Sequence, residues 1–219
     1  MGYEVRVTEN ELEEIPSPHL EPRIACRSQP PRQVSNNLIL IDGKTFVSTA
    51  VGGDIVPAVA PDVGFFYDDT RFLSHLELCV SGRQALVLSS NTENTFASQI
   101  ELTIGSMTLR NSYNVAENTI HIRRQQLLNE EVFFDRVTFL NFNMKPVELC
   151  VELYFDADFV DVFQVRGIPR KAHGRYYRPI RKNDGLFFFI VASTTCCDRL
   201  GSAWILSLLS WEKGKRVGI

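Results

Sequence analysis

The sequence has little of what helical, secreted or membrane-spanning proteins carry. Between residue 35 and about residue 165 hardly a segment shows helical periodicity, and the N-terminus has no apolar stretch typical of a secretory signal. The apolar region after Gly185 is split by Asp198 and Arg199 into pieces of about 12 residues, whereas a spanning helix needs about 20. We therefore expect buried strands or a core helix there, and no membrane partner.

Metal-binding and redox motifs are also missing. The cysteines are odd in number and show no C-x-x-C spacing, which favours buried thiols and a cytoplasmic location over a disulfide or zinc framework. The four histidines are scattered without metal-ligand spacing, so no metal or cofactor is expected. The net charge of −3 gives no global indication of a nucleic-acid partner. The five cysteines are Cys26, Cys79, Cys150, Cys196 and Cys197.

Residues 1–34 differ in composition from the rest of the chain. They hold five of the ten prolines and a cluster of glutamates between Glu9 and Glu14. Proline does not fit inside helices or central strands, and a charged stretch buries little apolar surface. The composition predicts a mobile arm, with a docked partner peptide as the alternative.

Residues 35 to about 165 contain successive strand patterns separated by turn signals. Asp42-Gly43, Ser81-Gly82 and Asn129-Glu130 each separate two apolar-rich runs, as in β-hairpins. Ile100, Leu102 and Ile104 alternate on one face. The pattern predicts an all-β fold, an antiparallel β-sandwich of the supersandwich kind over residues 35–185, followed by an apolar tail of uncertain structure over 186–219.

The most regular alternation is "PVELCVELYF", residues 146–155. Val147, Leu149, Val151, Leu153 and Phe155 would face one side of a strand, and the polar residues between them the other. This pattern predicts that the five apolar residues line the sandwich core.

A basic run extends from Arg166 to Lys182. Interleaved tyrosines make a nucleic-acid or phosphate site one interpretation, but no recognised nucleic-acid motif accompanies the run. We favour a solvated loop. The seven basic residues are Arg166, Arg170, Lys171, Arg175, Arg178, Arg181 and Lys182.

The stretch "FDADFVDVFQVRG", residues 155–167, places three aspartates within six positions. Asp156 and Asp158 would lie on one strand face with about 7 Å between Cα atoms, a spacing that a pair of glycosidase carboxylates or a divalent cation would also accept. In a third, structural interpretation, Asp158 or Asp161 pairs with Arg166 or accepts backbone N–H groups where the strand turns. We favour this polar corner.

A second charged stretch is "GFFYDDTRFLS", residues 64–74. Asp69 and Arg71 would share a face if extended, with Phe72 beside them, and could contact a sugar or a partner domain. An inter-strand salt bridge is the simpler interpretation.

Taken in order, "FVSTAVGGDI", "GFFYDDTRFLSHLELCVSGRQALVLSS" and "VELYFDADFVDVFQVRG" resemble the N-terminal domain of glycogen debranching enzymes of the amylo-α-1,6-glucosidase type. The likeness covers about residues 36–180 and does not extend into the tail after about residue 185. It implies a β-sandwich that precedes an (α/α) helical barrel, with the glucan-cleaving carboxylates in the barrel.

The resemblance therefore implies a non-catalytic accessory domain. Alternatives are a stand-alone carbohydrate- or protein-binding module and a small glycosidase that uses Asp156 and Asp158. Expected partners are a barrel domain and an α-glucan, and an exposed docking surface should make the isolated chain self-associate.

Overall fold

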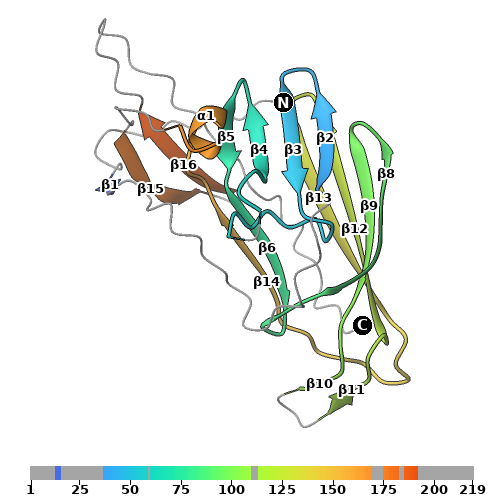
Figure 1. The fold of residues 1–219 in the computed structure, drawn as a ribbon. Helices are drawn as coiled ribbons and strands as arrows, with labels where there is room; N and C mark the ends of the chain where they lie inside the picture. Colours follow the sequence, from blue (N-terminus) through green and yellow to red (C-terminus); the bar gives the residue numbers. More distant parts are fainter. Residues whose placement is uncertain are drawn as a thin grey trace, which may run out of the picture. The chain divides into compact units, whose positions relative to one another are not determined.

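The computed structural model describes residues 13–15, 37–58, 60–109, 113–168, 175–182 and 185–191. These residues form β-strands almost throughout, with a single-turn helix, α1 (Val162–Val165) (Figure 1). The predicted all-β class is confirmed. The strands fall into two compact units, one holding β2 to β14 with α1 and the other holding β1, β15 and β16.

The first layer of the larger unit is a four-stranded antiparallel sheet in the order β13-β12-β9-β8. The strands are β13 (Val132–Asn141), β12 (Ile120–Asn129), β9 (Ala97–Thr103) and β8 (Leu86–Asn94). Along β12 the side chains alternate strictly between buried and more accessible positions, as expected for a strand with one face on a core.

The second layer combines two antiparallel sheets, β2-β3-β4-β5 and β14-β6-β7. Strand β5 runs into β6 with a break of one residue, Ser74, whose N–H donates to Asp156 O at 2.9 Å. The strands are β2 (Leu38–Asp42), β3 (Thr45–Thr49), β4 (Gly64–Tyr67), β5 (Thr70–Leu73), β6 (His75–Val80), β7 (Arg83–Gln84) and β14 (Val151–Asp156).

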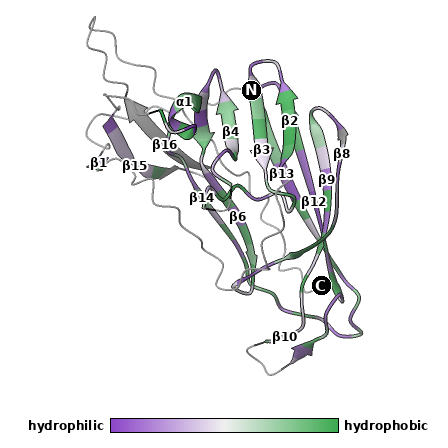
Figure 2. Ribbon diagram, in the orientation of Figure 1, coloured by the Kyte–Doolittle hydropathy of each residue, from purple (hydrophilic) through white to green (hydrophobic). Residues whose placement is uncertain are grey.

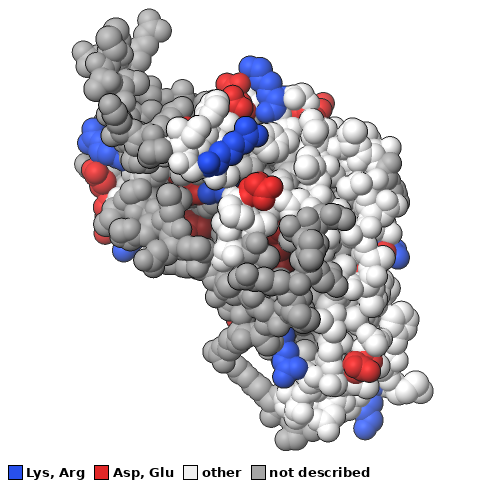
Figure 3. Space-filling model, in the orientation of Figure 1, with Lys and Arg blue, Asp and Glu red and all other residues white. Residues whose placement is uncertain are grey.

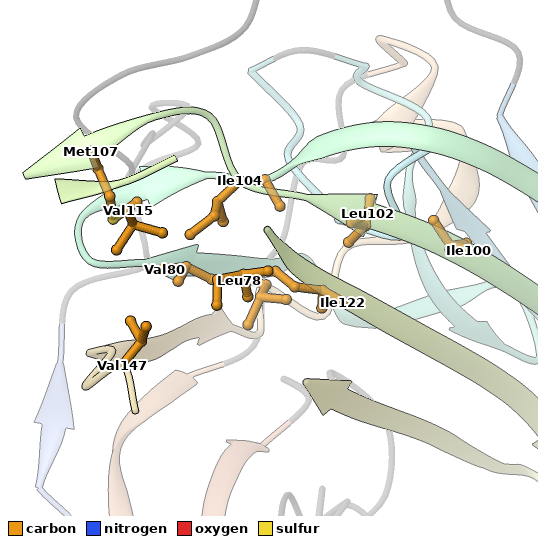
Figure 4. Packing of buried hydrophobic residues seen from close by; sticks show 11 residues of the cluster. Leu78, Val80, Ile100, Leu102, Ile104, Met107, Val115, Ile122 and Val147 are labelled. Carbon is orange, nitrogen blue, oxygen red and sulfur yellow. The ribbon is translucent and has the colours of Figure 1, made fainter. Parts of the chain in front are cut away.

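The core lies between these layers. Figure 4 shows Leu78 and Val80 of β6 facing Ile100 and Leu102 of β9 and Ile122 of β12. A short hairpin of β10 (Met107–Thr108) and β11 (Asn114–Val115) closes one end of the cluster. Figure 2 shows that β2, β4 and β6 of the second layer contain hydrophobic stretches. The β-sandwich prediction is confirmed.

The hairpin turns lie at or one residue beyond the predicted positions. Ser81 and Gly82 connect β6 to β7, as expected, whereas Gly43-Lys44 and Glu130-Glu131 occupy the other two turns. Both glutamates have positive φ, 49° and 66°, which type I′ hairpin turns require. Asn129 therefore ends β12, paired with Val132.

The prediction for residues 146–155 is only partly right. Val147 is buried, Leu149 and Leu153 pack half-buried on the core, and Val151 is exposed. Strand β14 begins only at Val151, because its partner β6 ends at Val80, where the chain turns. Beyond that point β6 offers no ladder for the strand to extend along.

The smaller unit contains an antiparallel sheet in the order β1-β15-β16. Its strands are β1 (Glu14–Ile15), β15 (Arg175–Lys182) and β16 (Gly185–Val191). The solvated-loop interpretation is therefore wrong for the second half of the basic run, which forms β15. Arg178 Nη1 lies 2.9 Å from Glu13 Oε2, and β1 pairs with Tyr176 and Tyr177 of β15.

The other residues of the predicted arm, and the tail beyond Val191, lie outside the described residues. Of the described cysteines, Cys150 is a free thiol but exposed, and Cys79 is buried but disulfide-bonded. The expectation of buried free thiols is therefore wrong for both. Within the described residues no helix has the length and hydropathy of a membrane span. The cytoplasmic location stays a prediction.

Candidate functional site: two buried arginine centres

The acidic corner is built from β5 and the segment after β14. The Arg71 N–H donates to Val160 O at 2.7 Å and the Val162 N–H donates to Asp69 O at 2.9 Å, so the two segments pair locally. This pairing brings the Arg71 and Asp158 side chains together across 87 residues of sequence.

Arg71 and Asp158 form a bidentate ion pair in the interior. Arg71 Nε donates to Asp158 Oδ1 at 3.1 Å, and Arg71 Nη2 donates to Asp158 Oδ2. Arg71 Nη1 also donates to the carbonyls of Pro61 and Val63, both at 3.2 Å. Because Arg71 is only 4 % exposed, the carboxylate and the two carbonyls replace the water that the guanidinium loses.

Gly64 lies directly on the Arg71 side chain. A Cβ at this position would come within 2.5 Å of Arg71 Cδ, and the ion pair holds that methylene in place. Glycine is therefore required for the close approach of β4 to the guanidinium stem.

Asp161 has a different role from Asp158. Its Oδ1 accepts the N–H groups of Phe163 and Gln164, at 2.7 and 2.9 Å, and caps helix α1. The Gln164 side chain accepts the Asp161 N–H in return, which completes a capping box. Arg166 follows as the C-cap, and Gly167 takes a positive φ of 87°.

The structure thus separates residues that the sequence placed together. Asp156 ends β14 and is exposed, whereas Asp158 is buried, so the two carboxylates do not open onto a common surface. Asp158 pairs with Arg71 of β5 instead of the nearby Arg166.

The three candidate contact residues are also divided. Asp69 lies in the β4–β5 turn with φ 63° and is exposed. Arg71 is buried in the ion pair, and Phe72 is buried in edge contacts with Tyr67 and Phe159. Only Asp69 offers an exposed side chain for contact.

A second arginine centre lies inside the sandwich. Arg124 of β12 is 0 % exposed and contacts two carboxylates, Asp135 of β13 and Asp54 of the β3–β4 connection. Its Nε donates to both Asp135 oxygens at 2.9 and 3.0 Å, and its Nη1 donates to Asp54 Oδ1 at 2.5 Å. The centre therefore joins the first layer to a loop of the second.

Neutral donors complete this centre. Asp54 accepts the Leu78 N–H at 3.2 Å and the Gln84 amide at 3.1 Å. Gln126 donates to Gly53 O at 2.8 Å and to Asp135 at 3.3 Å. The three bonds to carboxylate oxygens delocalise the one negative charge that two aspartates carry in excess over a single arginine, and the bond to Gly53 O fixes the Gln126 side chain.

The charge on Arg124 follows from this arrangement. Burial lowers its pKa, but the fields of Asp135 and Asp54 and their hydrogen bonds outweigh burial, and the pKa is raised above its ordinary value. The guanidinium is therefore charged at every pH at which the protein folds.

The sequence does carry a signal for this centre. Ile120, Ile122 and Leu128 mark the buried register of β12, and Arg124 and Gln126 stand in the same register. Two polar residues at apolar positions of a strand require buried partners. "VGGD", residues 51–54, indicates a turn, but nothing local shows that its aspartate reaches Arg124.

Both centres are suited to holding segments together. Each guanidinium is enclosed by carboxylates and carbonyls of the chain. Among the described residues, no group of three or more His, Cys, Asp or Glu side chains is arranged to hold a metal ion.

We expect Arg124→Met to cost about 3–5 kcal/mol of unfolding free energy, because it leaves the buried Asp54 and the half-buried Asp135 without their cation. Arg123→Met is the matched control: Arg123 is the next residue, on the opposite face, with a side chain 45 % exposed, and its loss should cost under about 1 kcal/mol. Urea denaturation measures both. Equal losses would contradict the buried network.

A double-mutant cycle of Arg71→Met and Asp158→Asn should show a coupling of about 1–3 kcal/mol, as for residues in direct contact. Arg83 lies at the opposite end of β6 from the corner, so a cycle of Arg83→Met with Asp158→Asn should be additive within about 0.5 kcal/mol. Zero coupling between Arg71 and Asp158 would show that the pair does not hold the corner.

Comparison with known proteins identifies the family. The family model of the N-terminal domain of some glycogen debranching enzymes matches residues 40–195. Comparison with curated proteins finds no significant match, and neither does comparison with solved structures. The matched range holds both arginine centres and strands β3 to β16. The chain therefore belongs to the family of N-terminal domains of glycogen debranching enzymes.

Proposed function

We propose that this domain is a non-catalytic partner of a glucan-hydrolysing helical barrel of the amylo-α-1,6-glucosidase type. The observation that carries the proposal is the use of four buried or half-buried carboxylates. Asp54, Asp135 and Asp158 each form an ion pair with an enclosed arginine, and Asp161 caps a helix. Side chains held in this way support a framework and are not poised to donate or accept a substrate proton.

Glycoside hydrolysis needs a different arrangement. An acid and a second carboxylate must face each other across the scissile bond, in a cleft that holds the sugar. The sequence-adjacent pair that suggested this chemistry, Asp156 and Asp158, is split between the surface and the interior. In the described part of the chain the only helix is a single turn, so the proposed barrel is a separate domain.

We therefore expect the purified chain to show no hydrolysis of α-1,4- or α-1,6-linked glucans in a reducing-sugar assay. Turnover that Asp156→Asn or Asp158→Asn abolishes would overturn the accessory role. A trace of activity unchanged in both variants would indicate a contaminating hydrolase, which a further purification step removes.

Exposed apolar residues on β2 support the proposal of a docked domain. Ile39 and Ile41 are each 52 % exposed, and the Ile41 N–H donates to Thr95 O at 2.6 Å, which places exposed Phe96 next to them. These three residues form what we call the β2 patch. We propose that the barrel of a debranching enzyme packs on it, and that the isolated domain self-associates through it.

We keep the expectation that the domain has no nucleic-acid partner. On the side shown in Figure 3, the described acidic and basic side chains are interspersed. Nucleic-acid binding requires basic residues clustered on one face.

The β2 patch is tested by sedimentation velocity over a range of concentrations. Replacing Ile39 and Ile41 by serine should shift the isolated domain toward monomer. The matched control replaces Leu86 and Leu88, which are also two residues apart and exposed, by serine, and should leave association unchanged. A wild-type protein that stays monomeric throughout would contradict the proposal, and so would equal effects of the two double variants.

A further inference from the structure

The outer face of the first sheet carries a connected row of planar polar side chains. Gln99 donates to Glu101 at 2.9 Å and Gln125 donates to Gln99 at 3.4 Å. Arg123 donates to the same Glu101 oxygen at 2.9 Å, and His121 Nε2 lies 2.7 Å from the other oxygen. We call these five residues the polar row. Their mutual contacts hold the side chains in place before any ligand arrives.

Exposed aromatic rings lie at both ends of this row. Phe134 is 51 % exposed and opposite Leu127 in the β12–β13 ladder, two pairs beyond Gln125 and therefore on the same face. Phe142 is 67 % exposed, with its ring centroid 6.5 Å from that of His121. His121 and Leu127 are six positions apart along β12, so the face is roughly 20 Å long.

The face carries charges of both signs, one carboxylate and two guanidinium groups. Glu101 is held between Arg123 and His121, and Arg136, opposite Gln125, adds guanidinium donors. A polyanion would require a cluster of basic side chains, and a purely apolar partner would leave the five polar groups without water. A neutral ligand with many hydroxyl groups and flat C–H faces matches both the row and the rings.

We propose that this face binds a single α-glucan chain. The amides, guanidinium groups and carboxylate exchange hydrogen bonds with sugar hydroxyls, and Phe134 and Phe142 lie against the apolar faces of glucosyl rings. The choice of glucan rests on the proposed function, since the family is that of N-terminal domains of glycogen debranching enzymes. The domain would then hold a chain of the polymer while the barrel cleaves it.

Affinity electrophoresis in native gels that contain glycogen tests this proposal. The wild-type protein should be retarded, and Phe134→Ala and Arg123→Ala should each weaken the apparent affinity at least about tenfold. Phe163→Ala is the matched control, because Phe163 is also 51 % exposed but lies on α1. Arg83→Ala is the control for Arg123, and both controls should keep wild-type retardation.

Three results would overturn the proposal. In the first, glycogen does not retard the folded wild-type protein. In the second, Phe134→Ala and Phe163→Ala weaken the apparent affinity for glycogen equally. In the third, the outer-face variants lose self-association and glycogen has no effect. Circular dichroism confirms that each variant is folded. If glycogen does not retard the protein, the glucan-binding face is wrong but the accessory role is unaffected. If the protein hydrolyses glycogen, the accessory role is wrong but the glucan-binding face is unaffected.

Discussion

The buried guanidinium of Arg124 is the constraint on which the sandwich depends. A charge with no exposed surface is tolerated only with full compensation. Here Asp54 and the Gly52 carbonyl of the β3–β4 connection supply it together with Asp135 of β13. A slip of β12 by one residue would carry Arg124 to the outer face and leave both carboxylates stranded. The network therefore specifies the register of β12 and β13 against the β3–β4 connection. That register in turn places the polar row on the opposite side of the sheet.

Arg71 repeats the same device at the edge of the second layer. In both centres a glycine packs against the arginine stem: Gly64 on Arg71, and Gly53, with φ 82°, on Arg124. A Cβ on Gly53 would lie 2.8 Å from Ile100 and 3.1 Å from Arg124. The glycines let a loop or strand approach the guanidinium closely enough for carbonyls to accept its hydrogen bonds. The polar side chains of the interior therefore stabilise the fold, and binding falls to residues on the surface.

Local features of the fold were predictable, and long-range pairings were not. Ser81-Gly82 specifies its own turn, and Ile100 and Leu102 show their buried face by alternation. Arg71 and Asp158 are 87 residues apart, and nothing in the local sequence indicates that they pair. The sequence therefore suggested the nearby Arg166 as the partner of Asp158. Arg124 could have been suspected from its apolar register, yet its partner Asp54 lies 70 residues away and is placed by tertiary packing. The length of β14 likewise depends on where its partner strand turns.

Hydrogen exchange at the Arg124 side chain shows directly whether the buried network holds the sandwich together. The Nε–H of Arg124 donates to Asp135 in the interior, whereas the Nε–H of Arg123 donates to Glu101 on an accessible face. Isotope-edited NMR of arginine-labelled protein follows both protons in one sample. We expect the Arg124 Nε–H to exchange only through global unfolding, as slowly as the core amides of β12. Exchange of the Arg124 proton as fast as that of Arg123 would contradict this expectation.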